Sequence, residues 1–408
     1  MNCRHCHASL TEQFVDLGTA PPSNAYLTAA DLHAPEKYYP LRVHVCTVCW
    51  LVQTEDYARH NELFAADYAY FSSFSESWLA HARDYVAGVV GQFGLGSNSL
   101  VIEIAANDGY LLQYVQARGI PCLGIEPTAS TAAAARQRGI RVREQFFGVA
   151  VARQLLDAQE AADLLIANNV LAHVPDINDF VSGFAIALKP SGVASFEFPH
   201  LLRLIEGVQF DTIYHEHYSY LSLLAVERIF AHCGLRLFDV QELPTHGGSL
   251  RVYAQRADGG QRPASAAVRA LLECERAAGM ADVDFYRGFQ ARVARVRDEF
   301  QSFLIARRRA GKRLAAYGAA AKGNTLLNYA AVRADAIEFV ADRNPAKQGR
   351  FLPGSRIPVV AESQLRVAQP DYVLILPWNL REELSVQLDY VRAWGARLVT
   401  AVPVLEIL

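Results

Sequence analysis

The chain has 408 residues, with 39 basic and 42 acidic side chains and a formal net charge of −3. So small an imbalance argues against a nucleic-acid surface and against a polybasic membrane patch. No apolar stretch approaches the roughly 20 residues of a membrane span, and the sequence shows no signal-peptide pattern. We therefore expect a cytoplasmic protein of two or three domains, with neither nucleic acid nor a membrane as partner.

Two CxxC knuckles lie in the first 60 residues, and they consist of Cys3, Cys6, Cys46 and Cys49. Each knuckle can present two sulfurs to one tetrahedral ion, so a pair of knuckles is typical of a structural zinc site. A redox pair would need only one CxxC beside a thioredoxin-like unit. His5 and His7 are rival ligands, but a closed structural site favours four thiolates. We predict a zinc-binding domain over residues 1–65.

The segment 67–83 predicts a loop that passes into a helix, with Ser75 as the N-cap. Tyr68 and Tyr70 precede this helix. They are either core residues or a lid over a ligand site in the next domain. We assign them to the ligand site.

Residues 66–260 follow a doubly wound α/β pattern. An apolar strand over 99–105 leads into a turn and a helix, and a second strand ends about twenty residues later at Glu126, where an acid is placed to bind ribose hydroxyls. The dinucleotide GxGxxG fingerprint is absent, which argues against NAD. This order of elements resembles that of S-adenosylmethionine (SAM) methyltransferases, with a non-enzymatic Rossmann domain as the alternative. We expect cofactor contacts from Tyr68, Tyr70, Glu103, Asn107, Asp108, Gly109, Glu126, Asn168 and Asn169.

The segment 210–221 holds two histidines, a glutamate, an aspartate and three tyrosines within twelve residues. A strand over 195–200, just upstream, ends in Pro-His. Polar groups after a strand end indicate a ligand site, because ligands bind outside the carboxyl ends of strands in α/β sheets. A solvated loop is the alternative, although ionisable and aromatic residues rarely interleave so densely without a pocket to line.

Residues 261–408 predict a helical connector followed by a Rossmann-like α/β domain. Before it, His246 lies at the turn of a hairpin that completes the sheet of the second domain. The segment 313–325 predicts a strand, a glycine turn and a helix start, which would offer backbone N–H groups and Lys322 to an anion. It lacks the Gly-Lys-Ser/Thr of a Walker motif. A degenerate domain kept for packing is the alternative.

The chain as a whole resembles the sugar C-methyltransferases of deoxysugar biosynthesis, which act on dTDP-linked keto-deoxysugars. The matching segments run almost end to end: both knuckles and residues 103–112, 169–174, 197–200, 214–218 and 318–325. The resemblance implies a SAM-dependent C-methyltransferase with structural Zn²⁺, whose C-terminal domain helps to hold the nucleotide-sugar. Substrate contacts are expected from Glu197, His200, His246, Lys322 and Asn324.

Methylation of carbon requires that a proton alpha to a ketone be removed and that the enolate be stabilised. We predict His217 as the base, because the resemblance aligns it with that role and a neutral imidazole suits the task. Tyr214 and His173 are candidates to hydrogen-bond the enolate oxygen. Glu216 is a candidate to orient an imidazole or to bind a sugar hydroxyl. On an extended segment neighbouring side chains point in opposite directions, so this block faces one site only if the backbone bends.

Two other functions remain open. An O- or N-methyltransferase acting on a sugar or small natural product would need a base but no enolate stabiliser. A zinc-bearing scaffold protein with an inactive Rossmann core would need neither. The methylated ring carbon, the sugar and the oligomeric state are left open, and a monomer is compatible with the sequence.

Overall fold

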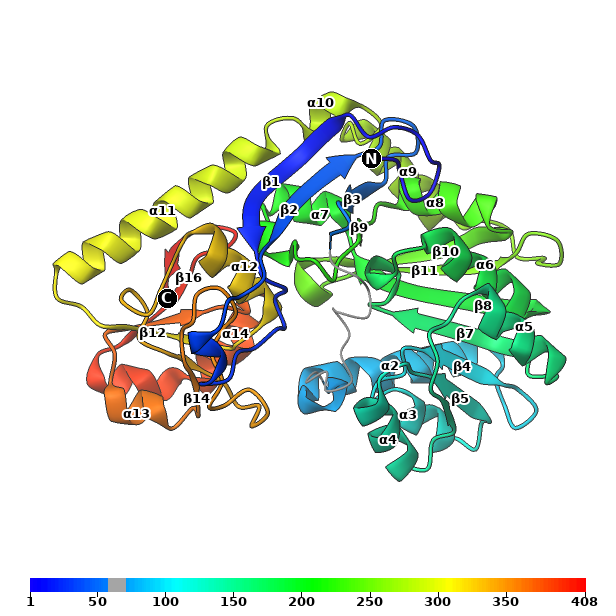
Figure 1. The fold of residues 1–408 in the computed structure, drawn as a ribbon. Helices are drawn as coiled ribbons and strands as arrows, with labels where there is room; N and C mark the ends of the chain where they lie inside the picture. The colour runs from blue at the N-terminus through cyan, green and yellow to red at the C-terminus, as the bar shows by residue number, and fades with distance from the viewer. Residues whose placement is uncertain (58–70) are drawn as a thin grey trace.

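The computed structural model describes residues 1–57 and 71–408, which form three β-sheets (Figure 1). The small N-terminal sheet has the order β1-β2-β3-β9, with β1 (Glu12–Ala20), β2 (Tyr39–Val45), β3 (Val52–Thr54) and β9 (Ser219–Tyr220). In β2 the side chains of Leu41, Val43 and Val45 are buried while their neighbours are partly exposed, as expected for a strand with one face on a core. The strand β9 comes from the second domain, so the two regions are joined by strand pairing.

The central sheet has seven strands in the order β10-β11-β8-β7-β4-β5-β6. Its parallel part consists of β4 (Val101–Ile104), β5 (Cys122–Ile125), β6 (Val142–Arg143), β7 (Ala162–Asn168) and β8 (Leu188–Pro199). The antiparallel edge consists of β10 (Leu235–Leu243) and β11 (Ser249–Arg256). All four residues of β4 are buried, which is typical of a parallel strand covered on both faces.

Helices cover both faces of this sheet. Helices α2 (Glu76–Phe93), α3 (Leu112–Gln116) and α4 (Ala129–Gln137) contribute to one buried cluster. Helices α5 (Val149–Asp157), α6 (Ile177–Ala187) and α8 (Leu223–His232) contribute to another. The predicted N-cap of α2 is confirmed, because the Ser75 hydroxyl accepts a hydrogen bond from the backbone N–H of Trp78 at 3.2 Å. The short helix α7 (Leu201–Glu206) follows β8 directly.

The C-terminal sheet has the order β14-β13-β12-β15-β16-β17. Its strands are β12 (Leu314–Tyr317), β13 (Val340–Ala341), β14 (Val359–Val360), β15 (Tyr372–Ile375), β16 (Arg397–Thr400) and β17 (Glu406–Ile407). The predicted connector forms α9 (Ala266–Ala277), α10 (Val283–Tyr286) and α11 (Phe289–Arg309), and α11 crosses the top of the molecule in Figure 1. Helices α12 (Ala321–Tyr329), α13 (Gln364–Ala368) and α14 (Arg381–Gln387) complete the domain. The predicted α/β fold class, with a cysteine-rich N-terminal domain and two further sheets, is confirmed.

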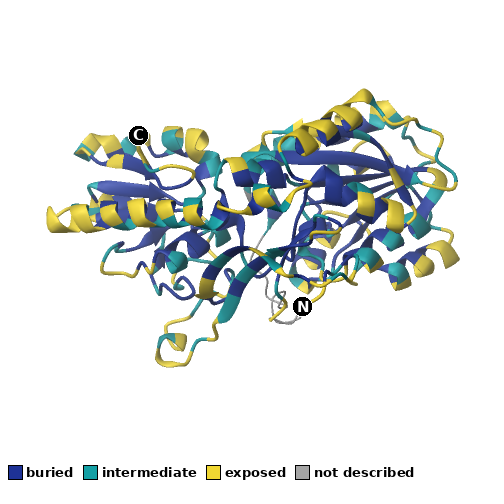
Figure 2. Cartoon of the chain, turned by 90° about the horizontal axis from the view of Figure 1, so that it is seen from above, coloured by how far each residue is buried: buried dark blue, intermediate teal, exposed yellow. Residues whose placement is uncertain are grey.

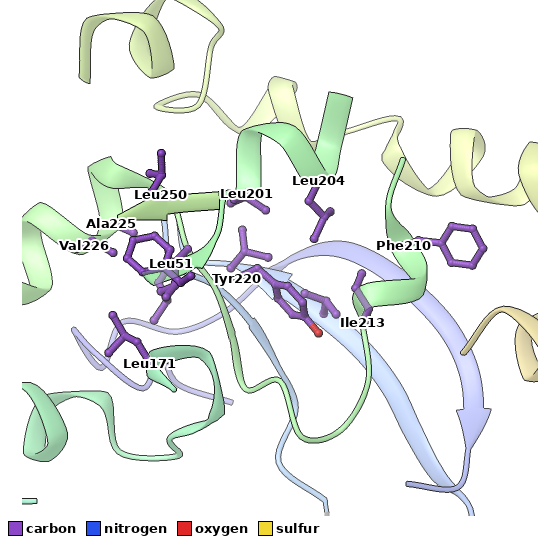
Figure 3. Close-up of a cluster of buried hydrophobic side chains, with 14 of the residues drawn as sticks. Leu51, Leu171, Leu201, Leu204, Phe210, Ile213, Tyr220, Ala225, Val226 and Leu250 are labelled. Atoms are coloured by element: carbon purple, nitrogen blue, oxygen red, sulfur yellow. The ribbon is translucent and has the colours of Figure 1, made fainter. Parts of the chain in front are cut away.

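The buried side chains of the three sheets form a shared core. One cluster runs from the N-terminal sheet through the central sheet into the C-terminal domain. Leu51, Leu171 and Tyr220, which belong to different parts of the chain, are among its members (Figure 3). The exposed residues lie mainly on the outer faces of helices and in loops (Figure 2). Within the described ranges, no helix is both long enough and apolar enough to cross a membrane.

Candidate active site

The backbone bends at residues 214–217, which we call the histidine turn. The N–H of His217 donates to the carbonyl of Tyr214 at 2.9 Å, and the two rings lie 3.9 Å apart between centroids. His215 points elsewhere and donates from Nε2 to the Pro40 carbonyl at 3.2 Å. Glu216 accepts a hydrogen bond from the amide of Asn24 at 3.2 Å. The bend therefore groups Tyr214 with His217 and directs the two residues between them toward the N-terminal region.

The imidazole of His217 is held in one tautomer. Its Nδ1 lies 2.7 Å from the carbonyl oxygen of Thr212, and a carbonyl can only accept, so Nδ1 carries the proton and Nε2 carries the lone pair. Burial lowers the pKa of His217 well below its usual value, and the nearby His173 and Lys322 act in the same direction. The His173 ring lies 4.5 Å from the His217 ring. His217 is thus a neutral imidazole at pH 7, with its lone pair on Nε2.

The turn after β4 is tight and left-handed. Asn107 and Gly109 have φ angles of 49° and 79°, in the left-handed region. A Cβ at Gly109 would lie 2.8 Å from Ile140, so glycine is required there. Glu126, at the end of β5, is buried and accepts the backbone N–H groups of Asn107 and Thr128 at 2.8 and 2.9 Å. It fixes the turn, and its oxygens retain lone pairs for further donors.

Several buried oxygens around the carboxyl ends of β4 and β7 have no hydrogen-bond partner among the described residues. They belong to Glu103, Asp108, Asn168 and Asn169. Buried polar atoms are normally hydrogen-bonded, so a row of unsatisfied acceptors fits a ligand rich in N–H and O–H donors. The hydroxyl and amino groups of SAM meet this requirement. Burial also raises the pKa of Glu103 well above its usual value.

A charged network that the sequence did not reveal lies at the ends of β8 and β11. The Glu197 carboxylate, fully buried, pairs with the guanidinium of Arg251 and lies 2.9 Å from Nε2 of His81 on α2. Thr245 donates its hydroxyl to Glu197 at 3.2 Å. Burial alone would raise the pKa of Glu197, but the hydrogen bond with His81 and the charge of Arg251 lower it below its usual value. Glu197 is thereby held as a carboxylate in the interior, and its predicted role in substrate binding stays a prediction.

His246 lies in the turn between β10 and β11, beside this network. It has a φ of 56°, and its Nε2 lies 3.3 Å from the amide nitrogen of Asn169. The Trp78 ring lies 5.5 Å away and also stacks on His81. Burial lowers the pKa of His246 to about 4, so this imidazole is neutral at pH 7. The structure thus brings His246 next to a residue that we assigned to the cofactor.

The C-terminal domain contributes a second group of buried polar side chains. Asp211, just before the histidine turn, accepts the indole N–H of Trp378 at 2.7 Å. The ammonium of Lys322 donates to the side chain of Asn379 at 3.0 Å and lies 4.9 Å from the Trp378 ring centroid. A Cβ at Gly247 would lie 2.5 Å from that ring, so Trp378 packs directly on the turn next to His246. Lys322 is therefore placed on the same side of the molecule as His217.

Two predicted substrate residues have other partners in the structure. His200 is buried, and its Nε2 lies 2.8 Å from Glu275, whose carboxylate also accepts the N–H groups of Leu223 and Leu224. These contacts make His200 part of the support for the start of α8. The amide of Asn324 donates to the carbonyl of Ser23 at 2.6 Å. The contacts of His200 and Asn324 give no support to a role in substrate binding.

The four knuckle cysteines come together as predicted. Their sulfurs all lie within 4.8 Å of one another, with Cys3 to Cys49 and Cys6 to Cys46 both at 3.5 Å. Four thiolates about 2.3 Å from a tetrahedral zinc ion are separated by about 3.8 Å, so these positions fit the metal. Tyr68 and Tyr70 lie outside the described residues.

Sequence comparisons cover nearly the whole chain. Residues 3–64 match a zinc binding domain family, residues 78–240 a methyltransferase domain, and residues 244–403 a C-methyltransferase C-terminal domain. The chain is 34% identical over 403 residues to C-methyltransferase NovU of Streptomyces niveus, covering 98% of this chain and 95% of the relative. It is 28% identical over 93 residues to a ubiquinone biosynthesis O-methyltransferase of Rhodopseudomonas palustris (strain BisA53), covering 23% of this chain and 37% of that protein.

Among solved structures, the chain is similar to magnesium protoporphyrin IX methyltransferase from Synechocystis PCC 6803 with bound SAM. The identity is 15% and the TM-score 0.33, with 44% of this chain and 79% of that chain covered.

Proposed function

Because this chain belongs to the family of SAM-dependent C-methyltransferases that includes NovU, we propose that it methylates the carbon alpha to the ketone of a dTDP-linked keto-deoxysugar. SAM is its cofactor, and its four-cysteine cluster is consistent with the zinc-binding domain that it matches.

The observation that carries the proposed mechanism is the hydrogen bond from His217 Nδ1 to the Thr212 carbonyl. It leaves Nε2 as the nitrogen that takes the alpha proton, so the C–H bond breaks, an N–H bond forms, and the electron pair passes to the ketone oxygen. Tyr214 and His173 lie against the His217 ring, which supports a role for them as donors to that oxygen. A preorganised donor in a buried site stabilises the developing negative charge.

Bound SAM would supply an electrophilic methyl group: the alpha carbon would form the new C–C bond as the S–CH3 bond breaks, and S-adenosylhomocysteine would leave with that electron pair. The residues that would hold it are the buried polar groups at the ends of β4, β5 and β7, above all Glu126 and Asn107, Asp108 and Gly109 of the turn. A donor bound there close to the base would gain much of the rate from that proximity.

Support for a nucleotide-sugar comes from the C-terminal domain. Helix α12 follows a strand and a glycine turn, and the partly buried Lys322 lies in its first turn. The free N–H groups of a helix start and a lysine favour an anion such as a diphosphate. Burial lowers the pKa of Lys322, and the nearby Asp211 carboxylate opposes this shift in part.

Product analysis tests this function. Purified protein is incubated with SAM and a panel of dTDP-linked keto-deoxysugars, and the product is identified by mass spectrometry and NMR. We expect a methyl group on the carbon next to the ketone. We also expect wild-type protein without SAM to exchange that C–H in deuterated water. A product methylated on oxygen or nitrogen, without C–H exchange, would show that the chain belongs to the alternative reaction class.

A further inference from the structure

The N-terminal sheet ends on the segment that carries the proposed base. Strand β3 pairs with β9 in antiparallel register, with Val52 opposite Tyr220 and Gln53 opposite Ser219. Strand β9 begins two residues after His217. The zinc-binding region is therefore attached to the backbone of the histidine turn rather than to a remote surface.

Thr54, the last residue of β3, contacts the backbone of His217 itself. Its backbone N–H donates to the carbonyl of Tyr218 at 3.1 Å. Its hydroxyl lies 3.2 Å from the carbonyl oxygen of His217 and 3.5 Å from that of Tyr218. Thr54 is buried, so these carbonyls depend on it in place of water.

The peptide unit between residues 217 and 218 is held from both sides. Its carbonyl, that of His217, accepts from the Thr54 hydroxyl, and its N–H, that of Tyr218, donates to the carbonyl of Ala172 at 2.8 Å. Ala172 immediately precedes His173. One peptide unit thus fixes the backbone next to both histidines of the site.

The first cysteine knuckle holds Thr54 in turn. The guanidinium of Arg4, which lies between the two cysteines of that knuckle, donates to the Thr54 carbonyl at 3.0 Å. The backbone N–H of Arg4 donates to the Gln53 side chain at 2.9 Å, and the Gln53 amide donates to the sulfur of Cys3 at 3.2 Å. An unbroken set of contacts therefore leads from the knuckle to the histidine turn.

We propose that Thr54 is a positioning residue for proton abstraction, and that the first cysteine knuckle acts through it to aim the His217 imidazole. The role of Thr54 rests on the proposed role of His217 as the base. General-base catalysis depends on placement within hydrogen-bond reach of the proton. A support for folding alone would affect stability without separating kcat from KM.

The test compares Thr54→Val, which keeps the shape but loses the hydroxyl, with Thr54→Ser, which keeps the hydroxyl. Methyl transfer and C–H exchange in deuterated water are measured with the dTDP-linked keto-deoxysugar that wild-type protein methylates, together with zinc content and SAM affinity. Displacement of about 1 Å costs up to about a hundredfold in rate, so we expect Thr54→Val to lose about tenfold in kcat and in exchange. KM, SAM affinity and zinc content should stay within twofold, and Thr54→Ser should match wild type.

Equal kcat in Thr54→Val, Thr54→Ser and wild type would overturn this inference, as would a loss confined to KM or SAM affinity. If Thr54→Val does not fold, Arg4→Gln decides, because Gln lacks the guanidinium but leaves the backbone contact of residue 4 in place. We expect a loss in kcat of about threefold there with unchanged KM, as for other small misplacements, and an unchanged kcat refutes the inference. A wild-type protein that makes no C-methylated product would instead refute the proposed function.

Discussion

Replacement of Asp211 by Asn tests whether the folded protein binds the proton of this buried carboxyl more tightly than the unfolded chain does. The Asp211 carboxyl is fully buried, and its Oδ2 accepts the indole N–H of Trp378 at 2.7 Å. Its Oδ1 has no hydrogen-bond partner within residues 1–57 and 71–408. Burial raises the pKa of Asp211 from 3.8 to about 6, although Lys322 and the indole act in the opposite direction. An Asn oxygen can accept the same indole N–H without carrying a charge.

The sign of the pH dependence follows from the raised pKa. The folded state binds the Asp211 proton more tightly than the unfolded chain, so the stabilising contribution is complete below about pH 4 and is lost as the pH rises through about 6. The difference of about two pKa units corresponds to about 3 kcal/mol of unfolding free energy, of which about 1 kcal/mol lies between pH 5 and pH 8. Because Asn does not titrate, the unfolding free energy of Asp211→Asn does not fall with pH through this position.

Urea unfolding of wild-type protein and Asp211→Asn at pH 5 and pH 8 measures the effect. We expect the variant to gain about 1 kcal/mol on wild type as the pH rises from 5 to 8. Asp157→Asn, at an exposed position of α5, controls for the loss of a carboxylate and should follow wild type. Parallel pH profiles for wild type and Asp211→Asn would refute the reasoning, since the folded state would then not hold this proton more tightly.

Two further predictions concern the metal and the cofactor. Protein purified without chelator should carry about one zinc per chain, and Cys46→Ser should impair folding more than chemistry, because a structural zinc site contributes folding energy. Metal analysis that finds no zinc would contradict this. Glu126→Ala should weaken SAM binding by roughly 1–3 kcal/mol in calorimetry, because ligand donors and the N–H of Asn107 lose their acceptor. Unchanged SAM affinity would mean that Glu126 does not bind the ribose.

The parts of the site that the sequence predicted best depend on short-range spacing. The two knuckles bring together four sulfurs because each CxxC is a local unit, and only their pairing needed the fold. The acid of Glu126 and the turn at Gly109 follow strand ends, where an α/β sheet places its ligands. Strand ends recur at this edge of any sheet of this topology, so pattern and position predicted where Glu126 and Gly109 lie, while their contact with SAM stays a prediction.

The remaining contacts arise only when distant elements pack together. His81 and Arg251 are 170 residues apart in the chain and meet at Glu197. Trp378, in the segment that follows β15, contacts Asp211 at a separation of 167 residues. Neither pairing has a local signal. The contact between His200 and Glu275, 75 residues apart, has no local signal either, and a role of His200 in substrate binding stays a prediction.

The bend at the histidine turn also depends on contacts from distant parts of the chain. Alternation along an extended segment would have separated Tyr214 from His217, yet the backbone hydrogen bond between them brings the rings together. The turn is supported by neighbours from both other domains. Thr54 binds the His217 carbonyl, and Thr325 on α12 donates to the Ile213 carbonyl at 2.9 Å. Those supports are not visible from the twelve residues of the block.

The most direct test of the account is C–H exchange by His217→Asn. The variant and wild type are incubated in deuterated water with the dTDP-linked keto-deoxysugar and S-adenosylhomocysteine, which fills the cofactor site but has no methyl group to donate. Loss of the base should slow exchange and methyl transfer by about 10²–10⁴-fold with SAM affinity unchanged, whereas Tyr214→Phe and His173→Asn should slow both less. Exchange at the wild-type rate in His217→Asn, with its loss in Tyr214→Phe or His173→Asn, would contradict the account and place the base elsewhere in the site.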